Sequence, residues 1–214
     1  MFTGLIETKG RIAAIEPSAT GRRLIVEASD WAYRPDAGAS IAVNGCCLTV
    51  VESRDGRHQF DVVHRSLEMT TLGRLTVGDS ANLDRAATLD TLLGGHLVKG
   101  HVDGTGEVLE IDDGNDWRVR IAAPAGVREH LVDRGSITVD GVSLTVARVL
   151  RDGDVSGSSV IGFEIALIPE TLERTTLEAL QVGSRVNLEA DAMAKMVAAH
   201  VERLLSARDE RPQI

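Results

Sequence analysis

Aromatic residues and long apolar runs are scarce in this chain of 214 residues. Aromatic side chains make up 3% of it, which argues against the stacking platforms of proteins that bind single-stranded nucleic acid. The formal net charge of −9 points the same way, because nucleic acids and anionic membranes repel an acidic protein. No apolar run approaches the roughly 20 residues of a membrane span, and the amino terminus has no apolar signal core. We therefore expect a cytoplasmic protein with no nucleic-acid or membrane partner.

Cysteine is equally rare, and its two copies are adjacent. Side chains of neighbours on a strand point to opposite faces, so we expect no disulfide between Cys46 and Cys47, and we expect Cys46 to be a small core residue. The chain also lacks a phosphate loop, a dinucleotide fingerprint and a GxSxG elbow around Ser143. These absences argue against nucleotide-binding enzymes and serine hydrolases.

What the chain has is a repeat. Residues 135–146 read GSITVDGVSLTV, and residues 40–50 read SIAVNGCCLTV, 96 positions earlier. Further on, the offset grows to 105, and the extra residues fall around 152–162, a segment with a loop composition. A period of about half the chain indicates two similar domains, since a solenoid would repeat at roughly 20–50 residues. We expect one domain over 1–97 and a second over 98–194.

Each half has the pattern of an all-β domain. Short alternating runs predict strands at 23–28, 48–53, 60–65, 117–123 and 163–168. Hairpin turns are expected at the dipeptides Asn44-Gly45, Asp55-Gly56, Asp140-Gly141 and Asp152-Gly153. Residues 66–72 and 171–177 each have the composition of a short helix before the next strand. About six short strands per half most naturally close into a small antiparallel barrel, because closure removes exposed edges.

The carboxyl-terminal segment 190–208 has no counterpart after the first half. Met193, Val197, Val201 and Leu204 lie on one face of a predicted amphipathic helix. An apolar face needs a partner, and the sequence leaves two open: the chain's own barrel or another copy of the chain.

The repeated strand carries small polar residues on one face. Cys47 and Thr49 share a face in the first half, as Ser143 and Thr145 do in the second, while the bulky apolar residues point the other way. Small polar side chains suit the lining of a pocket. A strand that simply faces solvent is the alternative.

Two histidines, His96 and His101, lie near the junction of the halves. On a strand, His101 and Asp103 would share a face, and His96 would not. A carboxylate beside a histidine is a general acid–base pattern, although a surface pair is the commoner case. Metal binding has little support, because no further ligand lies at the required spacing.

Five motifs, in order and in both halves, resemble those of the riboflavin synthases of the trimeric α type: MFTG, VNGCCLTV, GGHLVKGHVDG, GSITVDGVSLTV and IPETLERTTL. The resemblance implies two six-stranded antiparallel Greek-key barrels and a carboxyl-terminal helix that assembles a homotrimer. It implies a dismutation of two molecules of 6,7-dimethyl-8-ribityllumazine to riboflavin and 5-amino-6-ribitylaminouracil, without metal or organic cofactor. An association with lumazine synthase is a further partner that it allows. A non-catalytic lumazine- or flavin-binding protein of the same fold is the alternative, and a flavin-reductase-like barrel has less support.

The resemblance also implies the site residues, each active site lying between one subunit's first barrel and its neighbour's second barrel. The first half is expected to bind substrate through Gly4, Leu5, Ile6, Cys47, Leu48, Thr49, Asp61, Val62, Val63, His64, Arg65 and Ser66. The second half is expected to use Gly100, His101, Val102, Ser143, Leu144, Thr145, Leu167, Ile168, Pro169, Glu170, Thr171 and Leu172, with Arg134 reaching a ligand in the neighbouring subunit. The catalytic candidates are His101, Ser143, Cys47, Ser40, Thr145 and Asp191, with His101 the best proton shuttle by its chemistry.

Overall fold

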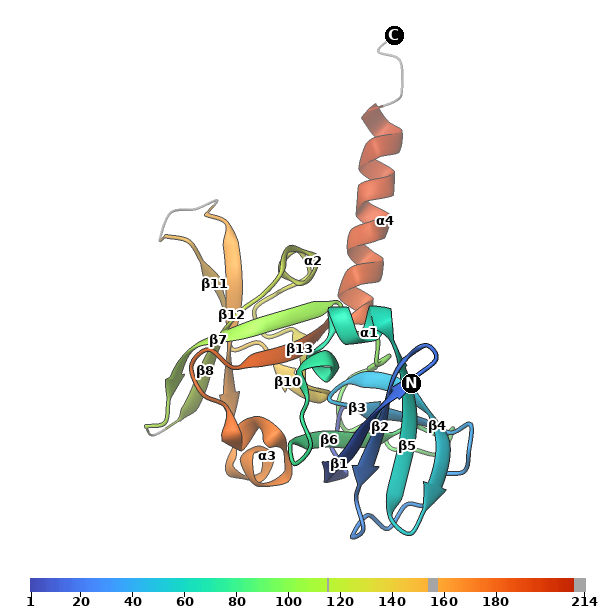
Figure 1. Cartoon of the computed structure of the whole chain (residues 1–214). Coiled ribbons are helices and arrows are strands. Elements are labelled where there is room, and N and C mark those ends of the chain that lie inside the picture. The colour runs from blue at the N-terminus through green and yellow to red at the C-terminus, as the bar shows by residue number, and fades with distance from the viewer. Residues whose placement is uncertain (115, 154–157, 210–214) are drawn as a thin grey trace.

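The chain folds into two β-barrels of similar topology and one long helix that stands away from them, as a computed structural model shows (Figure 1). The structure describes residues 1–114, 116–153 and 158–209. The predicted all-β class with a carboxyl-terminal helix is confirmed. Of the second half's extra loop, residues 154–157 lie outside the described residues.

The first half is a closed barrel in which the strands follow the order β1-β2-β5-β4-β3-β6. Its strands are β1 (Thr8–Ser18), β2 (Gly21–Glu27), β3 (Ser40–Val43), β4 (Cys46–Arg54), β5 (Arg57–Val63) and β6 (Ser80–Arg85). Asn44-Gly45 and Asp55-Gly56 have positive φ at both residues, as the tightest hairpins require.

The second half is a curled sheet in the order β10-β9-β13-β7-β8-β12-β11. Its strands are β7 (Gly104–Asp112), β8 (Trp117–Ala122), β9 (Ser136–Val139), β10 (Val142–Thr145), β11 (Arg148–Arg151), β12 (Val160–Leu167) and β13 (Arg185–Ala190). The two end strands, β10 and β11, are parts of one segment that corresponds to β4, separated only by Val146 and Ala147. Because the sheet's ends are continuous in the chain, the sheet closes on itself as the first one does.

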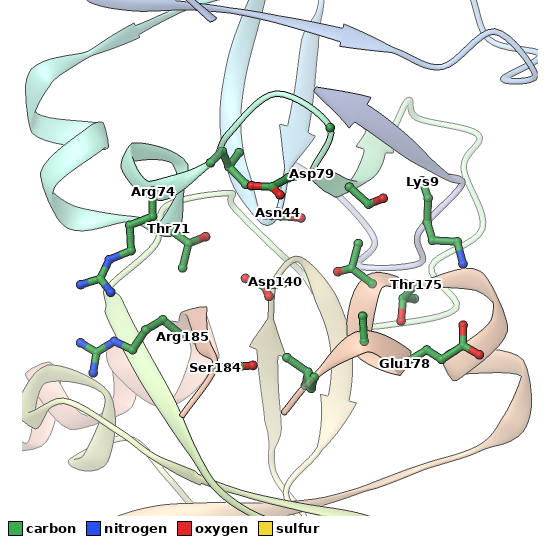
Figure 2. A pocket seen from close by; sticks show the side chains of 16 residues that line it. Lys9, Asn44, Thr71, Arg74, Asp79, Asp140, Thr175, Glu178, Ser184 and Arg185 are labelled. Carbon is green, nitrogen blue, oxygen red and sulfur yellow. The ribbon is translucent and has the colours of Figure 1, made fainter. Parts of the chain in front are cut away.

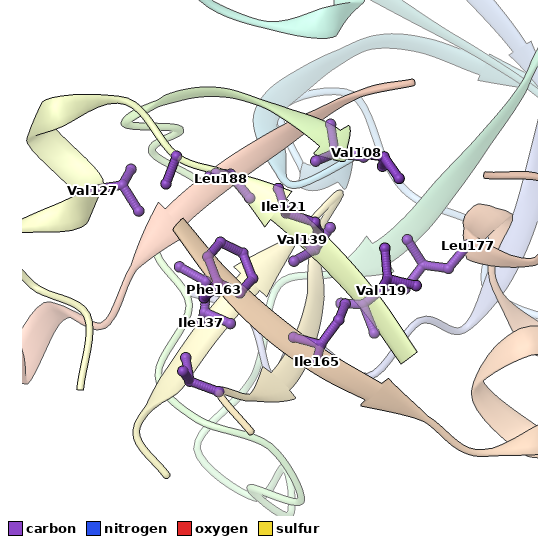
Figure 3. Packing of buried hydrophobic residues seen from close by; sticks show 14 of the residues in the cluster. Val108, Val119, Ile121, Val127, Ile137, Val139, Phe163, Ile165, Leu177 and Leu188 are labelled. Carbon is purple, nitrogen blue, oxygen red and sulfur yellow. The ribbon is translucent and has the colours of Figure 1, made fainter. Parts of the chain in front are cut away.

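Each barrel has its own apolar core. In the second, side chains from all sides of the sheet meet around Phe163, with Ile121, Ile137 and Leu188 fully buried (Figure 3). Phe60 occupies the equivalent place in the first barrel. The inward face of each strand supplies this core, which leaves the outward face of the repeated strand free for polar residues.

Short helices follow β5 and β12 at the two predicted places. They are α1 (His64–Met69) with the 3-10 helix η1 (Thr71–Arg74), and α3 (Pro169–Arg174) with the 3-10 helix η2 (Thr176–Ala179). The one-turn helix α2 (Ala125–Arg128) lies beside the second barrel.

The two barrels meet through a network of amides with approximate twofold symmetry. Asn187 Nδ2 donates to the carbonyl oxygen of Asn44 at 2.7 Å, and Asn82 Nδ2 donates to that of Asp140 at 2.9 Å. The two turns approach so closely that a Cβ atom on Gly45 would lie 2.6 Å from the backbone nitrogen of Gly141. Each hairpin therefore has its turn at the barrel contact and fixes the repeated strand that follows it.

Helix α4 (Ala192–Asp209) projects away from both barrels after its first turn (Figure 1). Its large apolar side chains are exposed: Met193, Met196, Val197, Val201, Leu204 and Leu205. Of the two options left open by the sequence, packing on the chain's own barrel is therefore not what the structure shows. No helix in the described part of the chain is both long and apolar enough to cross a membrane.

Candidate active site

The two halves exchange their amino-terminal segments. The backbone nitrogen of Ser143 in the second half donates to the carbonyl oxygen of Gly4 at 2.8 Å, and that of Cys47 in the first half donates to Gly100 at 2.8 Å. Phe2 and Val98 form an antiparallel bridge between the two segments. Each repeated strand is thus covered by a glycine loop from the opposite half.

The packing of the two cores shows the same exchange of amino-terminal segments. Ile6 belongs to the core of the second barrel, and Val102 packs against the core of the first. The expected division of pocket residues by halves is therefore wrong in two segments. Residues 4–6 lie with the strand of Ser143, and residues 100–102 lie with the strand of Cys47, because the glycine loops cross between barrels.

The predicted polar strand faces are present in both halves. Cys47 and Ser143 are half-buried, Thr49 and Thr145 are exposed, and the residues between them point toward the cores. Ser40 pairs with Thr49 across the β3–β4 ladder. The equivalent pairs in the second half are Ser136 with Thr145 and Thr138 with Ser143.

A polar chain leads inward from Ser143. Its Oγ lies 2.7 Å from Nδ1 of His96, and Nε2 of the same ring lies 3.2 Å from Oγ1 of Thr138. Burial lowers the pKa of His96, and the charge of Asp191 opposes that shift. The ring is therefore neutral at pH 7 and suited to accept a proton from a hydroxyl.

Sequence reasoning missed both His96 and Thr138 as site residues. Strand alternation predicts that His96 faces away from His101, but His96 lies on an irregular segment next to Gly95, where alternation does not apply. Thr138 had a usable signal, since a hairpin around Asp140-Gly141 pairs positions 138 and 143.

His101 and Asp103 do not form the expected pair. The carboxylate of Asp103 accepts from Lys195 Nζ at 2.8 and 3.0 Å and from the backbone nitrogen of Ala190 at 2.8 Å. His101 is exposed, and its backbone nitrogen donates to Glu189 at 3.0 Å. In the chain as described, the imidazole next to the Ser143 hydroxyl is that of His96.

The neighbourhood of Cys47 is apolar by contrast. Phe2, Ala42 and Val98 are buried together, and Cys47 packs against them. Cys46 points into the first barrel, where burial raises the pKa of its thiol to about 12, so it is inert at neutral pH. Both cysteines are free, as expected.

The other predicted residues lie around these strands. Residues 61–66 run from the end of β5, beside β4, into α1, and residues 167–172 run from β12 into α3. Asp61 pairs with Arg23 at 2.8 Å, and this pair lowers the pKa of the carboxyl. Asp191 accepts from the backbone nitrogen of Met193 at 2.8 Å and so begins α4. Arg134, at φ 65°, occupies the place of Gly38 in the first half and is exposed.

A cavity of about 740 Å³ lies elsewhere, between the two barrels (Figure 2). Thr71, Arg74, Asp140, Thr176 and Arg185 are among its lining residues. Its lining shares no residue with the predicted site, although the hairpins that reach Cys47 and Ser143 begin there. The two repeated strands are instead covered by the glycine loops. No group of three or more potential metal ligands is found among the described residues.

Two tandem segments of the chain, residues 3–86 and 99–191, match the family model described as Lumazine binding domain. The chain therefore belongs to the lumazine binding domain family.

Within that family, the relatives that match almost end to end are riboflavin synthases. The riboflavin synthase of Mycobacterium bovis is 44% identical over 96% of this chain and 98% of its own length, and that of Escherichia coli is 38% identical over 98% and 95%. The structure of LumP complexed with riboflavin superimposes with a TM-score of 0.73 at 28% identity, covering 89% of this chain and 99% of LumP. LumP has also been solved with 6,7-dimethyl-8-(1'-D-ribityl) lumazine, at a TM-score of 0.72.

Proposed function

We propose that this chain is a riboflavin synthase. It converts two molecules of 6,7-dimethyl-8-ribityllumazine into riboflavin and 5-amino-6-ribitylaminouracil by moving a four-carbon unit from one to the other. The observation that carries the proposal is the pair of matching half-sites, at Cys47 and at Ser143, each under a glycine loop from the opposite half. A reaction between two copies of one substrate needs two related pockets. Holding both reactants together is worth about 7–11 kcal/mol of the barrier.

The Ser143 half-site has the groups for the proton transfers of this reaction. A methyl group on the lumazine ring must lose a proton, and a nucleophile or water must add to the partner ring. His96 accepts the proton from the Ser143 hydroxyl or from a water held there, because its neutral ring lies 2.7 Å from Oγ. Thr138 fixes the orientation of the imidazole through its other nitrogen. The remaining site residues bind and orient the rings, and Arg134 contacts a ligand of the adjacent subunit.

Assembly completes the site. We propose a homotrimer held by α4, in which the first barrel of one subunit faces the second barrel of its neighbour. Support comes from the exposed apolar side chains of α4 and from the exposed Thr49 and Thr145. The proposal includes domains at 1–97 and 98–194 and a helix at 190–208. It also includes a cytoplasmic location, with association to lumazine synthase as a further partner.

The decisive experiment incubates the purified protein with 6,7-dimethyl-8-ribityllumazine and follows riboflavin absorbance. We expect one riboflavin for every two lumazines consumed. Ser143→Ala should lose most of this activity, whereas Ser80→Ala, which removes an exposed hydroxyl from β6, should not. Tight lumazine binding without any product would instead identify a binding protein of the same family.

The assembly is tested by truncation. Removal of residues 192–214 should give monomers with much reduced activity, measured by sedimentation and by riboflavin formation. Removal of residues 210–214 alone leaves α4 intact and serves as the control. Fully active monomers would contradict a site shared between subunits.

A further inference from the structure

Two buried carboxylates occupy equivalent positions near the ends of the last strand of each barrel. Asp84 on β6 is 2% exposed, and Glu189 on β13 is 2% exposed. Among the described residues, neither side chain belongs to a metal site, and neither forms an ion pair. Their hydrogen bonds go to the exchanged glycine loops.

Glu189 receives three backbone N–H groups from one loop. Lys99 donates to Oε1 at 2.8 Å, while Gly100 and His101 donate to Oε2 at 2.9 and 3.0 Å. Asp84 receives the N–H of Gly4 on Oδ2 at 3.0 Å, and the backbone N–H of Thr3 also donates to its carboxylate. Both carboxylates thus hold the glycine whose own carbonyl oxygen accepts from the repeated strand of the other half.

Such groups are unfavourable as simple core filling. Burial raises the pKa of Asp84 to about 7 and raises that of Glu189, because a charged carboxylate loses its hydration when a loop covers it. An apolar side chain of similar size would fill the same space without that penalty. What a carboxylate adds is a fixed acceptor for loop N–H groups, only one peptide unit from the strand that it steadies.

We propose that Glu189 and Asp84 are positioning residues for the reaction, holding the loop of Gly100 over Cys47 and the loop of Gly4 over Ser143. The inference rests on the proposed function. The two carboxylates are unequal in their bonding. Glu189 uses both oxygens, so an amide in its place must turn an NH₂ group toward N–H donors. Asp84 accepts from two loop residues, Thr3 and Gly4, rather than three, so an asparagine that presents its carbonyl oxygen to Gly4 loses less of the bonding than a glutamine in place of Glu189.

The test compares Glu189→Gln with Asp84→Asn in the full chain. Glu189→Gln should lower kcat about 30-fold with a much smaller change in KM, because misplaced reacting groups affect the chemical step. Asp84→Asn should lower kcat no more than about 3-fold, and Asp84→Glu, which copies the second half, should keep most of the activity. Glu16→Gln removes an exposed charge from β1 and is the matched control.

A second readout does not depend on turnover. The Gly100 loop covers Cys47, so Glu189→Gln should speed alkylation of Cys47 by iodoacetamide several-fold, located by mass spectrometry of the labelled peptide. Asp84→Asn should leave that rate unchanged, because its loop covers Ser143. Cys46 is buried and acts as an internal reference.

The outcomes separate the two proposals. A wild-type chain that forms no riboflavin refutes the proposed function, and the alkylation rates still decide the positioning role. An active wild type with Glu189→Gln unchanged in both kcat and alkylation rate refutes the inference. So does a loss of kcat that is fully explained by a loss of folded protein, measured by circular dichroism and thermal melting.

Discussion

The two half-sites share one scaffold and differ in polarity. Around Ser143 lie an imidazole and a second hydroxyl, those of His96 and Thr138. Around the equivalent Cys47 lie apolar side chains, among them Ala42 at the position that corresponds to Thr138. The backbone obeys the twofold symmetry of the repeat, whereas the side chains break it.

Under the proposed function, we expect this difference to give two identical substrates two roles. A pocket with a proton acceptor favours the molecule that must lose a proton, and an apolar pocket with a thiol favours the partner. The asymmetry involves the connection between the halves, since His96 lies in the segment that joins them. Four predictions test this comparison, beginning with the largest expected effect.

The glycine loops should be equally intolerant of side chains. A Cβ on Gly100 would lie 2.6 Å from Cys47 Cβ, one on Gly4 would lie 2.6 Å from Ser143 Cβ, and both glycines have positive φ. Gly100→Ala and Gly4→Ala should each reduce riboflavin formation by about 10²-fold or more, since small displacements of reacting groups have effects of that size.

The control for these loops is Gly126→Ala, where a Cβ meets nothing within 4 Å. It should keep wild-type activity. If only one of the two loop variants loses activity, the loops do not play matching parts.

The second prediction concerns the imidazole of His96, which lies in the Ser143 half-site. His96→Gln removes the proton acceptor but keeps a hydrogen-bonding side chain, and activity should fall about 10²-fold, the typical contribution of a general base. Cys47→Ser, which makes the two strands alike, should lose less than about 10-fold, which is below the typical contribution of a general base. Steady-state kinetics from pH 5 to 9 should also lose the acidic limb in His96→Gln.

The role of His96 has a clear counter-test. His101→Gln makes the same substitution at the exposed histidine five positions away, so any change in charge is the same as in His96→Gln. If His101→Gln loses the acidic limb and His96→Gln retains it, the assignment of the base to the Ser143 half-site is wrong.

The barrel contact offers a third comparison, between Asn44 and Asp140. Each accepts from the backbone of its neighbouring strand at 2.7 Å, but burial raises the pKa of Asp140 to about 7. A carboxyl whose pKa is higher in the folded state stabilises below its unfolded pKa of about 3.9, and this contribution is lost as the pH rises through 7. Asp140→Asn should therefore raise the free energy of unfolding at pH 8 by up to about 4 kcal/mol.

Thermal melts at pH 5 and pH 8 measure this effect. The gain in melting temperature of Asp140→Asn over the wild type should be small at pH 5 and larger at pH 8. The stability of the variant should keep some pH dependence from Asp84, whose pKa is also raised. The reciprocal change, Asn44→Asp, should destabilise the chain at pH 8. Equal melting shifts at both pH values would show that charge on Asp140 is not the cause.

The smallest effect is expected at Thr138. Thr138→Ala removes one 3.2 Å hydrogen bond to His96 and makes the position resemble Ala42, so the loss should be about 1 kcal/mol of transition-state stabilisation, or roughly 5-fold in kcat. Ser136→Ala, on the same strand face, is the matched control. A Thr138→Ala loss as large as that of His96→Gln would mean that Thr138 itself takes part in proton transfer.

Local sequence patterns predicted most of the fold. The dipeptides Asn44-Gly45 and Asp140-Gly141 fixed two hairpins, and alternation placed Cys47 and Ser143 on the outward face correctly. The long α4 lies where periodicity predicted it, and short helices follow β5 and β12 close to the segments whose composition predicted them. These features depend on φ preferences and side-chain alternation, which act over a few residues.

The sequence by itself therefore determined the repeat, the strand faces and the family resemblance. Only the tertiary structure decided that residues 4–6 cover Ser143 and residues 100–102 cover Cys47, and that His96 rather than His101 adjoins the Ser143 hydroxyl. The reason is physical. A glycine loop at positive φ can follow its own barrel or cross to the other, and the choice depends on which core receives Ile6 and Val102. That choice is made by packing between segments about a hundred residues apart, where local sequence patterns have no influence.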